Sequence, residues 1–255
     1  MTVADLCVLA AAGIAAGIVS TVAALASLVS YPVLLALGLP PLAANVTNTV
    51  SLCFAGVGAA AGSRLELAGQ AARVRRLGLV VALGGGTGAA ILLLSPARAF
   101  EVVAPVLIGG ASLVLLLQPS PGQQAPASDP DAPARDRSKP RLATLFLVAV
   151  YVGYFGAAGG ILLLAVLVPM LSQSLARTNA VKNVLTGVAN GVAAVGFAAF
   201  GPVHWEAVLP LGAGFLIGGW IGPALVRRIP GRLLQVLIAL AGLGLAIRLG
   251  LTTYH

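Results

Sequence analysis

Residues 177–200 read RTNAVKNVLTGVANGVAAVGFAAF, an apolar run with one lysine, Lys182, near its start. A helix that crosses a bilayer needs about 20 mostly apolar residues, so this stretch predicts a transmembrane α-helix. A charged side chain at the centre of such a helix costs about 2.5–3.5 kcal/mol on insertion scales. The surroundings of Lys182 must therefore offset that cost.

The whole chain has the composition of an integral membrane protein. Of its 255 residues, 59% are hydrophobic and 9% are charged, whereas about 25% of the residues in a soluble domain are charged. We predict an all-α, polytopic transmembrane fold with eight to ten membrane-spanning segments. About eight apolar blocks support this prediction, at 5–38, 42–62, 77–95, 99–117, 142–171, 178–200, 204–226 and 231–250.

Two of these blocks, 5–38 and 142–171, are too long for one straight helix across a hydrocarbon core of about 30 Å. Each contains small or helix-breaking residues midway. A discontinuous or re-entrant helix fits this pattern better than a tilted rod. We predict helix breaks, which would act as gates, at Ser20, Thr21 and Ser27 and at Gly153, Tyr154, Gly156, Gly159 and Gly160.

An internal duplication divides the sequence. ANVTNTVSLCFAG (44–56) aligns without a gap on NAVKNVLTGVANG (179–191), so that Asn48 matches Asn183. Between the halves, QPSPGQQAPASDPDAPARDRSKPR (118–141) has the composition of a flexible linker. We therefore predict a first transmembrane repeat (1–117), the linker (118–141) and a second transmembrane repeat (142–255). Such duplications are common in secondary transporters.

The distribution of basic residues predicts that the two repeats are inverted relative to each other. The loop after the second block carries Arg64, Arg73, Arg75 and Arg76, whereas the equivalent loop of the second half, GPVHWE (201–206), has no basic residue. Cytoplasmic loops are enriched in Lys and Arg, so we expect a cytoplasmic linker and external termini. The expected location is the inner or plasma membrane of the cell.

Carboxylates and histidines are absent from the interiors of the apolar blocks. All 7 carboxylates and both histidines are at block edges or in the linker. No paired carboxylates or nucleophile–base arrangement remain for catalysis inside the membrane. The net charge of +8 falls in short loop clusters, which is typical of membrane orientation and not of nucleic-acid binding. We expect no enzyme activity, no cofactor, no metal and no nucleic-acid partner, and the oligomeric state stays open.

The polar residues inside the blocks predict a binding site for a small anion. On a helix with 100° per residue, one stripe contains Asn179, Lys182, Asn183, Thr186 and Asn190. The matching stripe of the first repeat contains Thr47, Asn48 and Ser51. One ammonium among hydrogen-bonding groups, without a nearby carboxylate, suits an oxyanion. Broken helices would add main-chain N–H groups and positive dipole ends.

Simpler roles stay open for the same residues. Lys182 could snorkel towards the cytoplasmic surface near Arg177. Asn183 and Asn190 could serve helix packing, as polar and small residues often do in membranes. Transport of another small anion, such as a carboxylate, by a carrier or a channel is one alternative function. A non-transporting membrane scaffold is another.

Four motifs also resemble a known family. They are AGIVSTVAALASLVSYPVLLALGLPPLAANVTNTVSL (16–52), YVGYFGAAGGILLLAVL (151–167), TNAVKNVLTGVANGVAAVGFAAFGPVHW (178–205) and GGWIGPALVRRIP (218–230). In order and spacing they are similar to the two repeats of the TauE/SafE sulfite exporters, also called TSUP permeases. The resemblance implies a permease of bacterial inner membranes for sulfite, thiosulfate, sulfonates or other organosulfur compounds, and many members are known only as probable membrane transporters.

The chain departs from the family pattern at one place. Where the family typically has asparagine and alanine, then three glycines and a serine, this chain has Ser20 and Thr21, then Ala24, Leu25, Ala26 and Ser27. Loss of the glycines implies either an altered substrate or a site built mainly from the second repeat. The resemblance otherwise implies alternating access, with substrate bound between the repeats.

Overall fold

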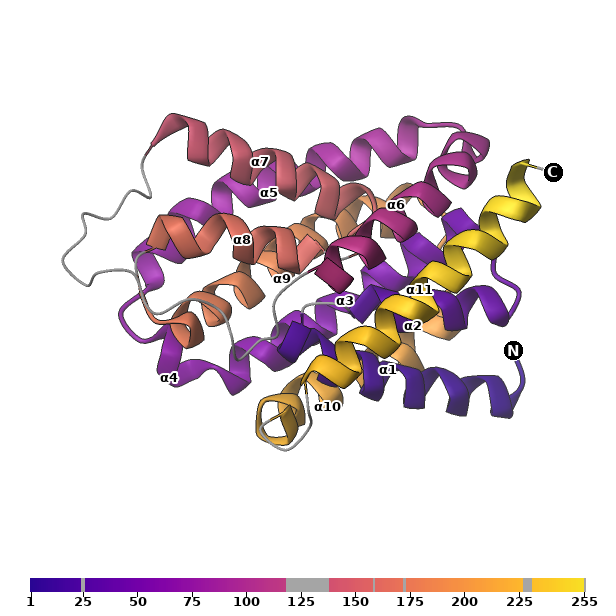
Figure 1. The fold of residues 1–255 in the computed structure, drawn as a ribbon, viewed down its shortest axis with the longest axis horizontal. Helices are drawn as coiled ribbons and strands as arrows, with labels where there is room; N and C mark the ends of the chain where they lie inside the picture. The colour runs from indigo at the N-terminus through magenta and orange to yellow at the C-terminus, as the bar shows by residue number, and fades with distance from the viewer. Residues whose placement is uncertain (24–25, 118–137, 158, 172, 227–230, 255) are drawn as a thin grey trace.

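The computed structural model describes residues 1–255 except 24–25, 118–137, 158, 172, 227–230 and 255 (Figure 1). Its elements are eleven α-helices, and the described residues contain no strand. The helices are α1 (Val3–Ala23), α2 (Ala26–Ala36), α3 (Pro41–Gly62), α4 (Arg64–Leu67), α5 (Ala71–Leu94), α6 (Ala97–Leu117), α7 (Lys139–Tyr154), α8 (Gly159–Leu171), α9 (Leu175–Phe200), α10 (Trp205–Val226) and α11 (Gly231–Tyr254).

Helix lengths confirm the predicted all-α, polytopic membrane fold. Among the described residues, six helices are long and apolar enough to cross a bilayer: α1, α3, α5, α6, α9 and α10. By contrast, α2 and α8 are apolar but only 11 and 13 residues long. At 1.5 Å per residue they extend roughly 16–20 Å, or about half of the hydrocarbon core.

Both over-long apolar blocks are divided between two helices. In the second block, α7 ends at Tyr154 and α8 begins at Gly159, which confirms the predicted break. Gly156 has a φ of +76°, a left-handed conformation that glycine adopts at little cost. In the first block, α1 ends at Ala23 and α2 begins at Ala26, and the residues between them lie outside the described part.

Two residues predicted at the second break belong instead to the last turn of α7. Gly153 packs against α5, where an added Cβ atom would overlap the backbone of Gly85. Tyr154 is the last helical residue, and its carbonyl oxygen accepts a hydrogen bond of 3.1 Å from Asn45 Nδ2 of α3. Close packing, and not a helix break, is therefore the reason for a glycine at position 153.

Small residues allow the long helices to approach closely in two seams. One joins α1 to α10 and the other joins α5 to α7. At the seam positions a Cβ atom would meet backbone or Cβ atoms of the neighbouring helix, as at small-xxx-small interfaces in membranes. The residues are Gly13, Gly17, Gly214 and Gly218 in the first seam and Gly84, Gly88, Ala149 and Gly153 in the second.

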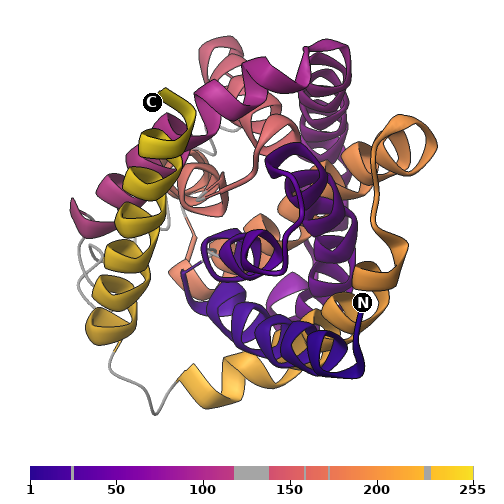
Figure 2. The same cartoon turned by 90° about the vertical axis from the view of Figure 1, so that its right-hand side faces the viewer.

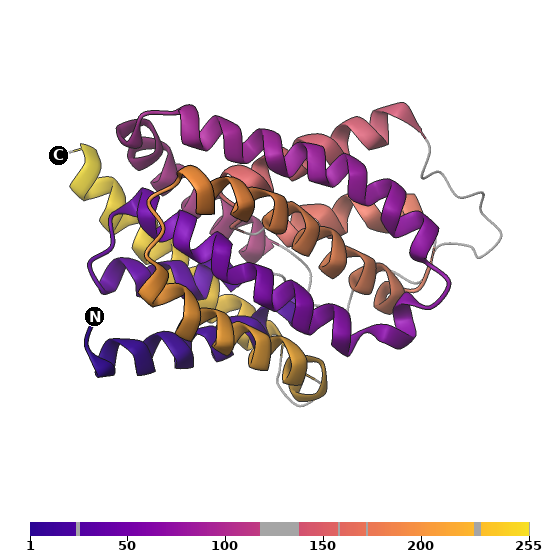
Figure 3. The ribbon, with the colours of Figure 1, turned by 180° about the vertical axis from the view of Figure 1, so that it is seen from behind.

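Helix partners in one half correspond to those in the other. In the first half α3 packs on α10 of the second half, and its counterpart α9 in the second half packs on α5 of the first. The central helices α3 and α9 also pack on each other. The termini lie at one end of the long axis, and α7 begins at the opposite end (Figures 1 and 3). α6 and α11 pack together along one side (Figure 2). Two inverted repeats would give this arrangement, and the inversion itself stays a prediction.

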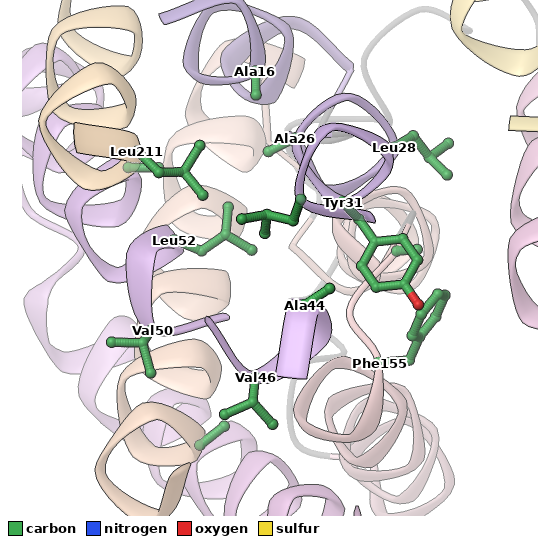
Figure 4. Close-up of a cluster of buried hydrophobic side chains, with 14 of the residues drawn as sticks. Ala16, Ala26, Leu28, Tyr31, Ala44, Val46, Val50, Leu52, Phe155 and Leu211 are labelled. Atoms are coloured by element: carbon green, nitrogen blue, oxygen red, sulfur yellow. The ribbon is translucent and has the colours of Figure 1, made fainter. Parts of the chain in front are cut away.

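An aromatic cluster packs against the break between α7 and α8. Tyr31 of α2 meets Phe155 edge to face, with ring centroids 5.8 Å apart and an interplanar angle of 82° (Figure 4). Phe100 of α6 also contacts Phe155, with ring centroids 5.8 Å apart. Phe155 is 3% exposed. Aromatic side chains of the first half thus pack against the break in the second half.

Candidate functional site

A cavity lies where the two divided helices meet α3 and α9. Its wall includes residues beside both breaks, namely Ser20, Ala26 and Ser27 from α1 and α2, and Gly156 and Gly160 at the second break. About 40 Å³ of it is open to the centres of water-sized molecules, and about 10–15 Å³ of such space holds one water. The cavity therefore fits a small solute or a few waters.

Lys182 is the charged group of this cavity. Its side chain is 1% exposed and is one of the largest fully buried side chains of the protein. The ion pair found among the described residues joins the Met1 amino group to Glu206, so no described carboxylate neutralises Lys182. Snorkelling requires an ammonium at the membrane surface. The burial of Lys182 beside this cavity does not agree with that alternative.

Polar groups of α9 continue this wall. Asn183, Thr186 and Asn190 line the cavity with Lys182, because positions three and four residues apart share one helix face. Thr186 Oγ1 and Asn190 Oδ1 are buried and have no hydrogen-bond partner in the described part of the chain. Leaving a buried polar group unsatisfied costs about 1–3 kcal/mol. A solute or water in the cavity would remove that cost.

Two helix N-termini meet the same space. α2 begins at Ala26 and α8 begins at Gly159, and Ala26, Ser27 and Gly160 line the cavity. The first N–H groups of a helix lack intrahelical partners, and its N-terminus carries about half a positive charge. Anions bind readily at such positions. Lys182 and these N-terminal N–H groups are the parts of the cavity wall that would favour an anion.

The crossing of α3 and α9 shapes one wall of the cavity. Gly56 and Gly187 both line it, and a Cβ atom on Gly56 would lie 2.9 Å from the Gly187 Cα atom. Larger side chains at this crossing would separate the helices. The glycine pair therefore holds the polar face of α9 close to α3.

Comparison with known proteins identifies the family. The family model of the sulfite exporter TauE/SafE matches residues 9–249. The chain belongs to this family. It is also 26% identical over 238 residues to "Probable membrane transporter protein ORF9" of Sinorhizobium sp., covering 92% of this chain and 88% of the relative. Both similarities indicate a membrane transporter. No solved structure matches the chain.

In this TauE/SafE protein, part of the predicted site comes together and part does not. Lys182, Asn183, Thr186 and Asn190 share the cavity. Thr47 and Ser51 do not line it. Their hydroxyl groups form hydrogen bonds with main-chain groups instead. Thr47 Oγ1 accepts from the His204 N–H at 3.0 Å, and Ser51 Oγ donates to the Thr47 carbonyl oxygen at 2.9 Å.

The remaining predicted residues take other positions. Asn48 bonds to Ser27 and Ser30 and does not line this cavity. Asn179 is partly exposed and also lies outside the cavity wall. The side chain of Thr21 lies outside the described residues. Four residues that we predicted at the gates also line this cavity: Ser20, Ser27, Gly156 and Gly160.

Sequence analysis missed the apolar and glycine part of the wall. Leu52, Ala55, Gly56 and Ala59 of α3 and Gly187 of α9 line the cavity. Gly187 follows Asn183 by one helical turn, so the polar stripe of α9 already contained a signal for it. Among the described residues, no cluster of three or more His, Cys, Asp or Glu side chains could hold a metal ion.

Proposed function

We propose that this membrane transporter moves a small sulfur-containing oxyanion such as sulfite, thiosulfate or a small organosulfonate. The observation that carries the proposal is the environment of Lys182, a buried ammonium that lines a cavity and forms no ion pair with a described carboxylate. A bound anion would supply the missing negative charge. Lys182 would then be a binding group and not a packing residue.

The chemistry of the cavity wall favours an oxyanion over a cation. An ammonium and an anion 4 Å apart attract each other by about 4 kcal/mol at an effective dielectric constant of 20. Thr186 adds a hydroxyl group whose oxygen atom has no described partner, and a hydroxyl can donate its hydrogen to an anion. The unpartnered Asn190 Oδ1 accepts hydrogen bonds, so it would bind a water molecule beside the anion. Open space of about 40 Å³ favours the smaller anions of this class.

Alternating access is the transport mechanism that this architecture supports best. The cavity lies between the two halves, at both helix breaks and beside the α3–α9 crossing. Rocking one repeat against the other would expose a site of this kind to each side in turn. The short helices α2 and α8 would then act as the gates. In this proposal the linker faces the cytoplasm, the protein resides in the plasma membrane, and no chemical step occurs.

Flux into proteoliposomes tests the proposal. Purified protein should transport sulfite or thiosulfate faster than acetate of equal concentration, and the substrate should raise the apparent melting temperature. Empty liposomes and a Lys182→Met protein are the controls. Preference for acetate would support the carboxylate alternative. Absence of flux for every anion tested, with intact protein, would contradict transport and favour a scaffold.

A further inference from the structure

A second, smaller cavity adjoins the lysine cavity. Its wall includes Tyr31 of α2, Asn45 and Asn48 of α3, and Phe155 at the second break. It offers about 10 Å³ to the centres of water-sized molecules, which is close to the space of one water. Ser27 lines both cavities and therefore lies at their junction.

A chain of hydrogen bonds fixes the side chain of Ser27. Ser30 Oγ lies 3.0 Å from the Ala26 carbonyl oxygen and 2.5 Å from Asn48 Oδ1, and we assign its one hydrogen to the nearer acceptor, Asn48. Asn48 Nδ2 donates to Ser27 Oγ at 3.2 Å. Because Ser30 holds the amide oxygen, the NH₂ group of Asn48 is directed at Ser27. The three side chains are at most 6% exposed. Such a buried network holds one arrangement of donors and acceptors.

This arrangement leaves the hydroxyl hydrogen of Ser27 available. A serine hydroxyl has one hydrogen to donate and two lone pairs to accept. Asn48 uses a lone pair, and Ser27 donates to no acceptor in the described part of the chain. Its hydrogen is thus directed away from Asn48. Lys182 lines the same cavity as Ser27, so an anion there would meet both donors.

We propose that Ser27 is a second anion ligand, held in its donating orientation by Asn48, at the point where the anion passes from the lysine cavity to the second cavity. This inference rests on the proposed transport function and assigns the first repeat a share of the site. Asn48 is a positioning residue, because it acts through Ser27. Tyr31 and Phe155, with ring centroids 5.8 Å apart, form part of the wall of the second cavity.

Kinetics of anion flux test this role. Ser27→Ala should raise KM about tenfold with little change in kcat, because the lost hydrogen bond is to a charged solute. Ser27→Cys keeps a weaker donor of similar size, so its KM should lie between those of the wild-type protein and Ser27→Ala. Thr49→Val is the matched control. The Thr49 hydroxyl donates to the Asn45 carbonyl oxygen of its own helix and lines neither cavity, so KM should not change.

A double-mutant cycle tests the positioning role of Asn48. Asn48→Leu should raise KM as much as Ser27→Ala, and the double variant should be no worse than either. Fully additive effects would show that Asn48 does not act through Ser27. A wild-type KM in a folded Ser27→Ala protein would overturn the inference while leaving the transport function intact. Absence of anion flux in the wild-type protein would overturn both.

Discussion

Replacing Lys182 with Met separates an anion-binding lysine from a structural one. Methionine has a similar length and volume, so the packing of α9 should persist. Lys182 is 1% exposed and has no described carboxylate partner. Removing an uncompensated buried charge stabilises a protein. We therefore expect the apparent melting temperature of the anion-free variant to rise.

Anion binding should change in the opposite direction. A hydrogen bond to a charged group contributes about 1.5–3 kcal/mol net, and 1.4 kcal/mol corresponds to tenfold in Kd. Lys182→Met should therefore weaken binding about ten- to hundredfold, and Lys182→Arg should have an intermediate effect because its donor geometry differs. Thermal shifts with and without sulfite, together with flux, measure both quantities. Near-wild-type binding and a lowered melting temperature would refute the reasoning.

Three further changes test the fold. Single cysteines replacing Ser128 and Thr252, with both native cysteines removed, should label from opposite sides of intact cells, and labelling from one side would contradict inverted repeats. Gly156→Ala should lower the melting temperature and the flux, because a φ of +76° costs an L-residue about 1–2 kcal/mol. Gly110→Ala, which has nothing within 4 Å of its added Cβ atom, is the matched control; equal melting temperatures of the two variants would show that the break is not built as described. Gly85→Val should prevent folding, because even a Cβ atom would lie 2.7 Å from the Ala189 carbonyl oxygen, and normal yield and stability in detergent would contradict that close approach.

Sequence patterns predicted the helices and the second break because those features are local. The lengths of the apolar blocks predicted the spanning helices, and the glycines of the second long block predicted the break between α7 and α8. The polar stripe of α9 predicted four residues that share a cavity, since helical periodicity alone places them on one face. Their role in binding stays a prediction.

The features that the sequence did not predict depend on contacts between segments that are far apart in the chain. Thr47 meets the backbone of His204, more than a hundred residues away, and no local pattern indicates that bond. Gly153 fits a helix break and a close helix contact equally well by sequence, and only the position of α5 distinguishes them. The convergence of both breaks on one cavity likewise depends on how the two halves pack.

A crystal structure with selenite, the heavier analogue of sulfite, tests the central claim most directly. Anomalous scattering from selenium would locate the anion independently of the protein density. We predict one strong peak in the cavity, within hydrogen-bonding distance of Lys182 Nζ and between the N-termini of α2 and α8. Selenite bound only at the protein surface, with Lys182 directed to the headgroup region, would contradict the account.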